Sequence, residues 1–187
     1  MQACAVHGSY AAQMRALVLF AAYTGMRPRE LFAFEGGDID RDAMRIEVRR
    51  RLCRGRVDLP KSNRPRRIAL TPPALEALEL LPQRTGLVFL SKQGRRLSQP
   101  TLLGYWGKVL ASAGLDFDFY LATKHWCVHD LHAELGLPPR VIAEQMGWTL
   151  AGTLKLLQVY GHGDIGALEE IDKAFGNNVT PLTVVSE

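Results

Sequence analysis

The stretch YTGMRPREL, residues 23–31, decides the fold because it ends one helix and begins the next. The segment before it, residues 11–23, is apolar on nearly every side, as in a helix buried in a core. Gly25 can end that helix, and Pro28 can start another without losing a hydrogen bond. The pattern therefore predicts a buried helix, a tight joint that holds Arg27, and a second helix.

After residue 44 the pattern changes to alternation of apolar and charged residues. Ile46 and Val48 alternate with charges, a turn follows at residues 54–56, and residues 66–70 (RRIAL) alternate again. Helical patterns then cover residues 74–81, 101–114, 122–135, 139–146, 150–158 and 166–175. The predicted fold class is α+β: a mostly helical domain with a small three-stranded antiparallel sheet.

The composition is that of one globular domain. The chain has 187 residues, of which 47% are hydrophobic and 22% charged. It contains no apolar run long enough to span a membrane, and its first residues do not resemble a signal peptide, so we expect a cytoplasmic protein. We expect residues 1–176 to form the domain and residues 177–187 a flexible tail. The three widely spaced cysteines, Cys4, Cys53 and Cys127, are expected to be reduced thiols.

Positive charge is concentrated in one segment. The net charge is +4, but residues 45–67 hold ten basic and two acidic side chains. Such a patch suits a polyanion, because each neutralised phosphate releases counterions. The alternative is a solubilising face. The side chains expected to contact DNA are Arg49, Arg51, Arg54, Arg56, Arg64 and Arg66.

Four motifs resemble the catalytic domain of the tyrosine recombinases, the phage integrase class of DNA breaking and rejoining enzymes. Thr24-Gly25-x-Arg27-x-x-Glu30-Leu31 is similar to the family's first arginine motif, and Pro60-Lys61-Ser62 to the strand turn that carries its lysine. IAEQMGW ends at Trp148, and VYGH follows with Tyr160 twelve residues later. The resemblance runs from about residue 10 to residue 175. We expect the N-terminal DNA-clamp domain of the family to be absent from this chain.

The resemblance implies a role for each matching residue. Tyr160 would attack the phosphodiester and hold DNA as a 3′-phosphotyrosine, and Lys61 would protonate the leaving 5′ oxygen. Arg27 would stabilise charge on the non-bridging oxygens, and Trp148 would support the site. The site-shaping residues would be Glu30 and His162, the latter beside the nucleophile. For Arg27 and Glu30, a helix-end salt bridge is the structural alternative.

The family's second motif, His-x-x-Arg followed by His, is altered. YLATKH occupies its place, with Lys124 or His125 at the arginine position and Leu121 or Ala122 at the histidine position. Lysine keeps the charge but loses the planar fork that contacts phosphate at two points. His125 and the nearby histidines could suggest a metal site, but no acidic or cysteine partner completes a recognisable zinc pattern. We therefore expect neither a metal nor another cofactor.

The expected function is therefore site-specific DNA recombination or integration, as in mobile elements, with double-stranded DNA as partner. Its expected place is the cytoplasm, associated with the nucleoid when bound to DNA. A homo-oligomer could form on DNA through the helix predicted at residues 166–175. The rival functions are a DNA-binding module that has lost catalysis, and a helical protein interaction domain.

Overall fold

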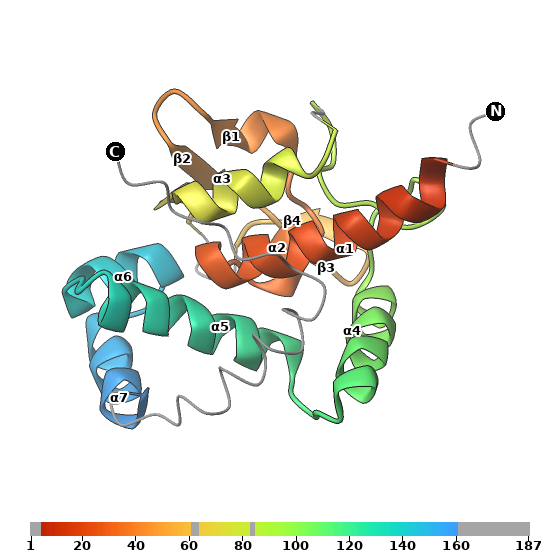
Figure 1. Cartoon of the computed structure of the whole chain (residues 1–187). Coiled ribbons are helices and arrows are strands. Elements are labelled where there is room, and N and C mark those ends of the chain that lie inside the picture. Colours follow the sequence, from red (N-terminus) through yellow and green to blue (C-terminus); the bar gives the residue numbers. More distant parts are fainter. Residues whose placement is uncertain (1–4, 61–63, 83–84, 161–187) are drawn as a thin grey trace, which may run out of the picture.

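The computed structural model describes residues 5–60, 64–82 and 85–160, shown in colour in Figure 1. Lys61, His162, the helix predicted at residues 166–175 and the predicted tail lie outside these residues. None of the described helices is long and apolar enough to cross a membrane.

The first helix, α1 (Ala5–Thr24), runs through the middle of the molecule. It packs against α3 (Pro72–Glu79) on one side and α5 (Phe119–His129) on the other. The main core forms around it, with Met14, Leu17 and Phe20 fully buried. The short helix α2 (Pro28–Leu31) follows directly after the Gly25 joint, as the sequence predicts. This joint lies beside the main core.

The sheet lies at one end of α1 and has three antiparallel strands, which confirms the predicted fold class. Its order is β1 (Ile39–Asp40), β2 (Arg45–Val48) and β5 (Arg66–Ala69), with Ile46 opposite both Ile39 and Ile68. The 3-10 turn η1 (Gly36–Asp38) precedes β1, a strand that the alternation did not predict.

The basic turn at residues 54–56 belongs to a separate hairpin of β3 (Arg51–Cys53) and β4 (Arg56–Asp58). Arg54 and Gly55 have φ angles of 49° and 77° at its tip. Positive φ at both central residues is what a type I′ hairpin turn requires. Both arginines of this turn, Arg54 and Arg56, are exposed.

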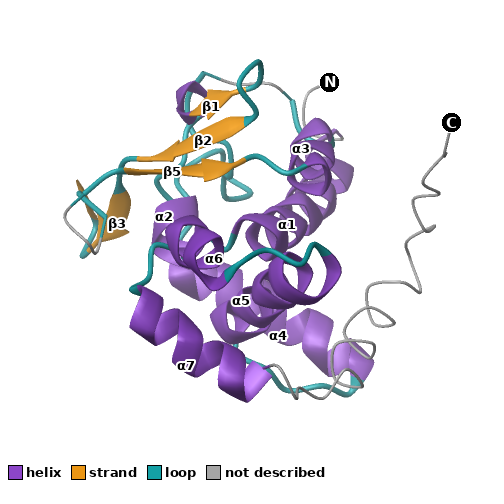
Figure 2. Cartoon of the chain, turned by 90° about the vertical axis from the view of Figure 1, so that its left-hand side faces the viewer, coloured by secondary structure: helices purple, strands orange, loops and turns teal. Residues whose placement is uncertain are grey.

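The remaining helices form a second layer (Figure 2). They are α4 (Gln99–Ala113), α5, α6 (Pro139–Met146) and α7 (Leu150–Tyr160). The predicted helix at residues 122–135 starts earlier, at Phe119, and ends in the π-helical turn η2 (Asp130–Glu134). Cys127, Ile142, Met146 and Leu157 form a smaller core among α5, α6 and α7.

Gln145 ties α6 to the free edge of β5. The backbone N–H of Ala69 donates to Oε1 of Gln145 (2.9 Å), and Nε2 of Gln145 donates to the carbonyl of Ala69 (3.3 Å) and to that of Thr24 (3.5 Å). The amide replaces the missing neighbouring strand, because it satisfies both backbone groups of one edge residue. The end of α6 is thereby fixed close to the end of α1.

Candidate active site

Arg27 and Glu30 form a pair at the start of α2, as either reading of the motif requires. The backbone N–H of Arg27 donates to Oε2 of Glu30 (2.9 Å), and Nη1 of Arg27 donates to Oε1 (3.2 Å). Glu30 is only 1% exposed, whereas Arg27 is 23% exposed. The carboxylate therefore holds an arginine that still reaches the surface.

A second arginine, Arg66 of β5, grips the same carboxylate. Its Nη1 and Nη2 donate to Oε1 and Oε2 of Glu30 at 2.8 Å and 2.9 Å, the bidentate geometry of a strong pair. Arg66 is 11% exposed, and its Nε is buried with no hydrogen-bond partner among the described residues. Arg66 forms this inward pair because it shares the inner face of β5 with buried Ile68. The predicted DNA contact at Arg66 stays a prediction.

These contacts keep Glu30 ionised. Burial alone would raise the pKa of Glu30, but the hydrogen bonds and charge of Arg66, together with those of Arg27, outweigh burial and lower the pKa. The cluster thus contains one buried negative charge shared by two guanidinium groups. Of the two, only Arg27 has charge to offer an outside anion.

Two glycines allow the surrounding elements to close on this pair. Gly147, which ends α6 with φ 65°, accepts a 3.5 Å hydrogen bond from Nη2 of Arg27. A Cβ atom at Gly147 would lie 2.9 Å from Cδ and Nε of Arg66. A Cβ atom at Gly25, which also has φ 65°, would lie 2.2 Å from Sδ of Met146 and 3.2 Å from Sγ of Cys127. Burial, with the charge of nearby Asp130, raises the pKa of the Cys127 thiol to about 12.

An open pocket of about 410 Å³ lies in front of Arg27. It takes side chains from the α1–α2 joint, the basic hairpin and the start of α5. Its lining residues are Arg27, Pro28, Arg29, Glu30, Arg51, Gln99, Asp118 and Tyr120. Three arginines against two carboxylates, one of which is Glu30 inside the cluster, give the pocket a positive balance suited to an anion.

The arginines of the basic segment divide into two groups. Arg49 donates to Asp38 (2.9 Å) and to the carbonyl of Gly37 (2.7 Å), and Arg50 donates to both Asp38 oxygens at 2.9 Å and 2.8 Å. Their charge is thus partly compensated within the fold. By contrast, Arg54 and Arg56 are exposed at the hairpin tip, and Arg64 is exposed before β5.

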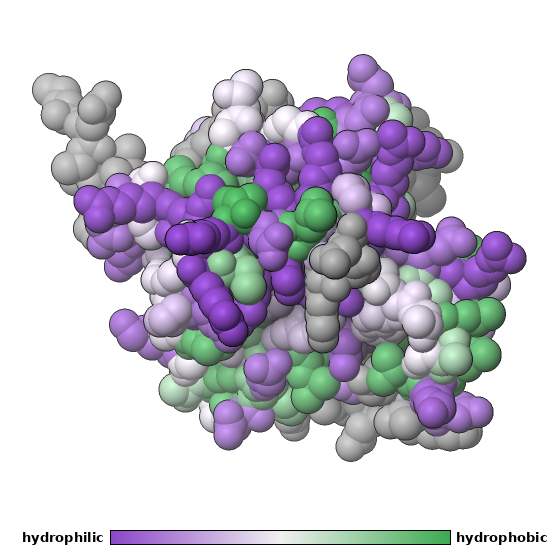
Figure 3. All heavy atoms as spheres, turned by 180° about the vertical axis from the view of Figure 1, so that it is seen from behind, coloured by the Kyte–Doolittle hydropathy of each residue, from purple (hydrophilic) through white to green (hydrophobic). Residues whose placement is uncertain are grey.

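Figure 3 shows the side of the molecule opposite to that in Figure 1, where hydrophilic side chains predominate in the upper part. Arg51 lines the pocket while its Nε donates to the carbonyl of Leu59 (2.9 Å). The hairpin and the pocket therefore share one residue, Arg51, whose Nη2 also lies 3.6 Å from Oδ2 of Asp58. The predicted DNA contacts at Arg49, Arg51, Arg54, Arg56 and Arg64 remain predictions.

The altered second motif lies on α5 beside the pocket. Nζ of Lys124 is 5.9 Å from the ring centroid of Tyr120, a pocket-lining residue. Leu121 is exposed and Ala122 is buried. Partial burial and the charge of Lys124 lower the pKa of His125, which favours a neutral imidazole at neutral pH.

The remaining predicted site residues are placed less completely. Trp148 packs on the edge of the smaller core and directly follows Gly147, the acceptor for Arg27. Tyr160 is the last residue of α7, and its side chain lies outside the described part, as do Lys61 and His162. No three His, Cys, Asp or Glu residues in the described ranges are grouped as metal ligands.

Sequence reasoning missed the Arg66 pair and the pocket contributions of Gln99, Asp118 and Tyr120. A signal for Arg66 was present, since it stands two and four residues before the apolar Ile68 and Leu70 and so on their face of the strand. Tyr120 and Asp118 carried no such signal, because their place depends on how α5 packs.

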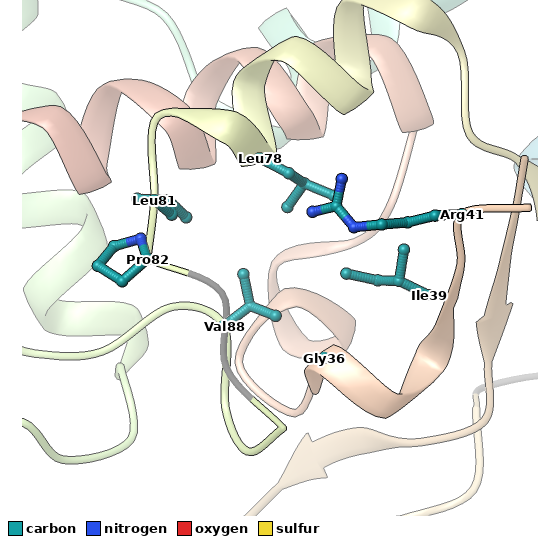
Figure 4. A pocket seen from close by; sticks show the side chains of 7 residues that line it. All are labelled: Gly36, Ile39, Arg41, Leu78, Leu81, Pro82 and Val88. Carbon is teal, nitrogen blue, oxygen red and sulfur yellow. The ribbon is translucent and has the colours of Figure 1, made fainter.

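A second pocket, of about 240 Å³, lies between α3 and the β1 region (Figure 4). It is lined mainly by apolar side chains, and the guanidinium of Arg41 extends over it toward Leu78. It contains none of the predicted site residues.

Comparisons with known proteins agree with this fold. The structure is similar to that of the Tn1549 transposon integrase in complex with circular intermediate DNA, with TM-score 0.65 and 20% identity over 84% of this chain and 58% of that one. It is also similar to XerA recombinase, with TM-score 0.62 and 20% identity over 95% of this chain and 62% of that one. The chain thus spans less than two thirds of these solved chains. No curated protein gives a significant match.

The sequence match covers most of the chain. The model of the Phage integrase family matches residues 1–164, a range that includes the Arg27 joint, the basic hairpin, the altered second motif and Tyr160. The chain therefore belongs to the phage integrase family, the tyrosine recombinases, as its motifs predict.

Proposed function

We propose that this chain is the catalytic domain of a site-specific DNA recombinase or integrase that cleaves and rejoins DNA through a 3′-phosphotyrosine. The observation that carries the proposal is Arg27, held by buried Glu30 at the edge of an open, arginine-lined pocket. A guanidinium fixed in advance stabilises developing phosphate charge without reorganising during the reaction. The solved Tn1549 transposon integrase, which has the same fold, was captured with DNA.

In the proposed reaction, the phenolic oxygen of Tyr160 bonds to phosphorus and its proton passes to water. The bond from phosphorus to the 5′ oxygen breaks, and Lys61 gives a proton to that oxygen. Arg27, with Lys124 or His125, stabilises the negative charge on the non-bridging oxygens. Rejoining is the reverse, with the 5′ hydroxyl displacing the tyrosine, so the phosphodiester energy is preserved.

The basic hairpin would hold the DNA. Arg54 and Arg56 lie at its tip, and Arg51 connects it to the pocket, so a backbone crossing the hairpin would lead a phosphate to Arg27. Phosphate contacts of this kind position DNA without reading its sequence. The chain could oligomerise on DNA through residues 166–175.

The second candidate function is a DNA-binding module without catalysis. It is favoured by the altered second motif. Lys124 or His125 stands there in place of an arginine, and exposed Leu121 or buried Ala122 stands in place of a histidine. Loss of one charge-stabilising donor typically costs about a hundred- to a thousandfold in rate. Such a module would bind DNA and form no covalent product.

The test uses the full chain and a nicked suicide DNA substrate, with products separated on a denaturing gel. A covalent protein–DNA product that is absent in Tyr160→Phe supports the recombinase. DNA binding without that product supports the module, and no DNA binding at low salt contradicts both. We expect Lys124→Arg to retain or raise cleavage, and its loss would contradict the assignment of Lys124 to the second motif.

A further inference from the structure

Arg66 stands among the basic residues that suggest DNA contact, but its surroundings are those of the site interior. Both terminal nitrogens are used on Glu30, at 2.8 Å and 2.9 Å, and only 11% of the side chain is exposed. In contrast, Arg54 and Arg56 of the same segment are exposed. A DNA phosphate could therefore reach Arg66 only by displacing Glu30.

Glu30 links Arg66 to Arg27. Oε1 of Glu30 accepts from Nη1 of both arginines, and Oε2 accepts from Nη2 of Arg66 and from the backbone N–H of Arg27. Each carboxylate oxygen is thus shared between β5 and the α1–α2 joint. A displacement of Arg66 would leave a buried carboxylate held from one side only.

Gly147 closes the same unit from α6. It contacts the stem of Arg66 so closely that a Cβ atom would lie 2.9 Å from two of its atoms, and its carbonyl accepts from Arg27 at 3.5 Å. Arg27 and Arg66 therefore both contact Glu30 and Gly147 in one small cluster. The direction of the Arg27 guanidinium depends on both the Glu30 carboxylate and the end of α6.

We propose that Arg66 is a positioning residue of the strand-transfer reaction, acting on the scissile phosphate through Glu30 and Arg27 without touching DNA. The inference rests on the proposed function, since it assigns a part in that reaction. A small displacement of a group that stabilises a transition state lowers the rate far more than it lowers substrate affinity.

The test compares Arg66→Met with the parent chain on the suicide substrate. We expect the single-turnover cleavage rate to fall about a hundredfold, the cost of a displacement of about 1 Å. DNA affinity and its salt dependence should stay unchanged, whereas loss of a phosphate contact would reduce the logarithmic salt slope by about one unit. Arg140→Met is the matched control, because Arg140 also pairs with a glutamate, Glu144, but at 3.6 Å on the exposed surface of α6. It should change none of these quantities.

A pH profile separates positioning from general destabilisation. The charged groups that face Glu30 are Arg66 from β5 and Arg27 from the joint, α6 offers the uncharged Gly147, and Arg29 and Arg51 line the adjoining pocket. Without Arg66 the pKa of Glu30 rises, so the acid limb of the rate profile should move to higher pH in Arg66→Met. Arg66→Lys keeps the charge and should recover part of the rate and part of the shift.

A reduced salt slope with an unmoved pH profile would make Arg66 a phosphate contact and overturn the proposal, as would a cleavage rate equal to that of the parent. If Arg66→Met does not fold, the cleavage rate, salt slope and pH profile are measured on Arg66→Lys, where a rate and a pH profile equal to those of the parent would overturn the proposal. If the parent itself forms no covalent product, the proposed function fails and the inference fails with it. The link between Arg66 and Glu30 can still be measured then, as the pH dependence of unfolding of Arg66→Met.

Discussion

Two buried carboxylates, Glu30 and Asp38, each hold two arginines, and the two clusters differ in what else those arginines contact. Asp38 is 2% exposed and binds Arg49 and Arg50, as Glu30 binds Arg27 and Arg66. Around Asp38, however, the arginines also donate to the carbonyls of Gly37 and Ala33 and to Glu35.

Around Glu30, by contrast, Arg27 lines a pocket of about 410 Å³ and makes a long contact of 3.5 Å with Gly147. The chemistry of the two clusters is the same, and the difference lies in how much of the outer guanidinium is already used. We therefore expect a structural role for the Asp38 cluster, and we propose phosphate binding for the Glu30 cluster only.

The largest expected effect that tests the different roles of the two clusters is a loss of folding stability. Asp38→Asn leaves two arginines without their buried charge, and we expect about 3–5 kcal/mol of destabilisation by urea unfolding. Glu47→Gln is the control, because Glu47 is 37% exposed and its pairs with Arg49 and Arg67 should contribute at most about 1 kcal/mol. Cleavage per folded molecule should not change in either variant. A loss of cleavage per folded molecule in Asp38→Asn would contradict the purely structural role of the Asp38 cluster.

The next effect is on catalysis. Arg27→Met should lower the rate of covalent product formation about a hundred- to a thousandfold, since a fixed donor to the phosphate is lost. Arg50→Met removes an arginine with a similar exposed fraction, 25%, from the other cluster and should retain cleavage while losing stability. Equal losses of cleavage in the two variants would show that the clusters do not differ in role. Both rates are measured below the unfolding temperature of the weaker variant.

A smaller loss of stability and of cleavage rate should reveal how tightly Gly147 packs against the Glu30 cluster. Gly147→Ala and Gly114→Ala both place a side chain at a left-handed helix end, with φ angles of 65° and 70°, and each should lose about 1–2 kcal/mol from strain. Only at Gly147 would the new Cβ press on Arg66, since Gly114 has no atom within 4 Å of that position. We expect Gly147→Ala to be the less stable by thermal unfolding and to cleave more slowly. Identical behaviour would mean that Arg66 adjusts freely.

The smallest effect is the pH dependence of stability. Because the pKa of Glu30 is lowered from its ordinary value of 4.5, its contribution is complete above that pH and is lost as the pH falls through the folded-state pKa. Urea unfolding of the parent and of Glu30→Gln should therefore converge in acid, below pH 4.5, and differ at neutral pH. A constant difference across the acid range would show that Glu30 is not held ionised by its arginines.

The sequence predicted those parts of the fold that depend on local signals. Gly25 and Pro28 marked the joint, and the bounds of α6 at residues 139–146 agree with the structure, because a proline starts that helix and Gly147 ends it. The strand β1 was missed since it has only two residues, too few to show alternation. The hairpin was assigned to the main sheet because strand pairing depends on the path of the chain, which periodicity does not contain.

The site was predicted where one motif contains both partners, as with Arg27 and Glu30, and not where partners are distant in sequence. Arg66 lies 36 positions from Glu30 and among other arginines, so local charge indicated DNA. Its inward direction follows from the register of β5 with β2 and from the buried face of that strand. A run of like charges thus conceals that Arg66 is turned inward by the register of its strand.

The thiol of Cys127 is buried where α5 meets the Gly25 joint, and its reaction with a thiol reagent can report when α5 separates from α1 and α6. With its pKa raised to about 12 it remains protonated at neutral pH, and thiol reagents attack only an accessible thiolate. Modification of Cys127 then requires α5 to separate from its neighbours, so the labelling rate measures how often these helices open. The partly exposed Cys53 reacts without such opening. If bound DNA stabilises the packing of these helices, Cys127 should be labelled more slowly in the presence of DNA. The ratio of the two labelling rates measures that stabilisation.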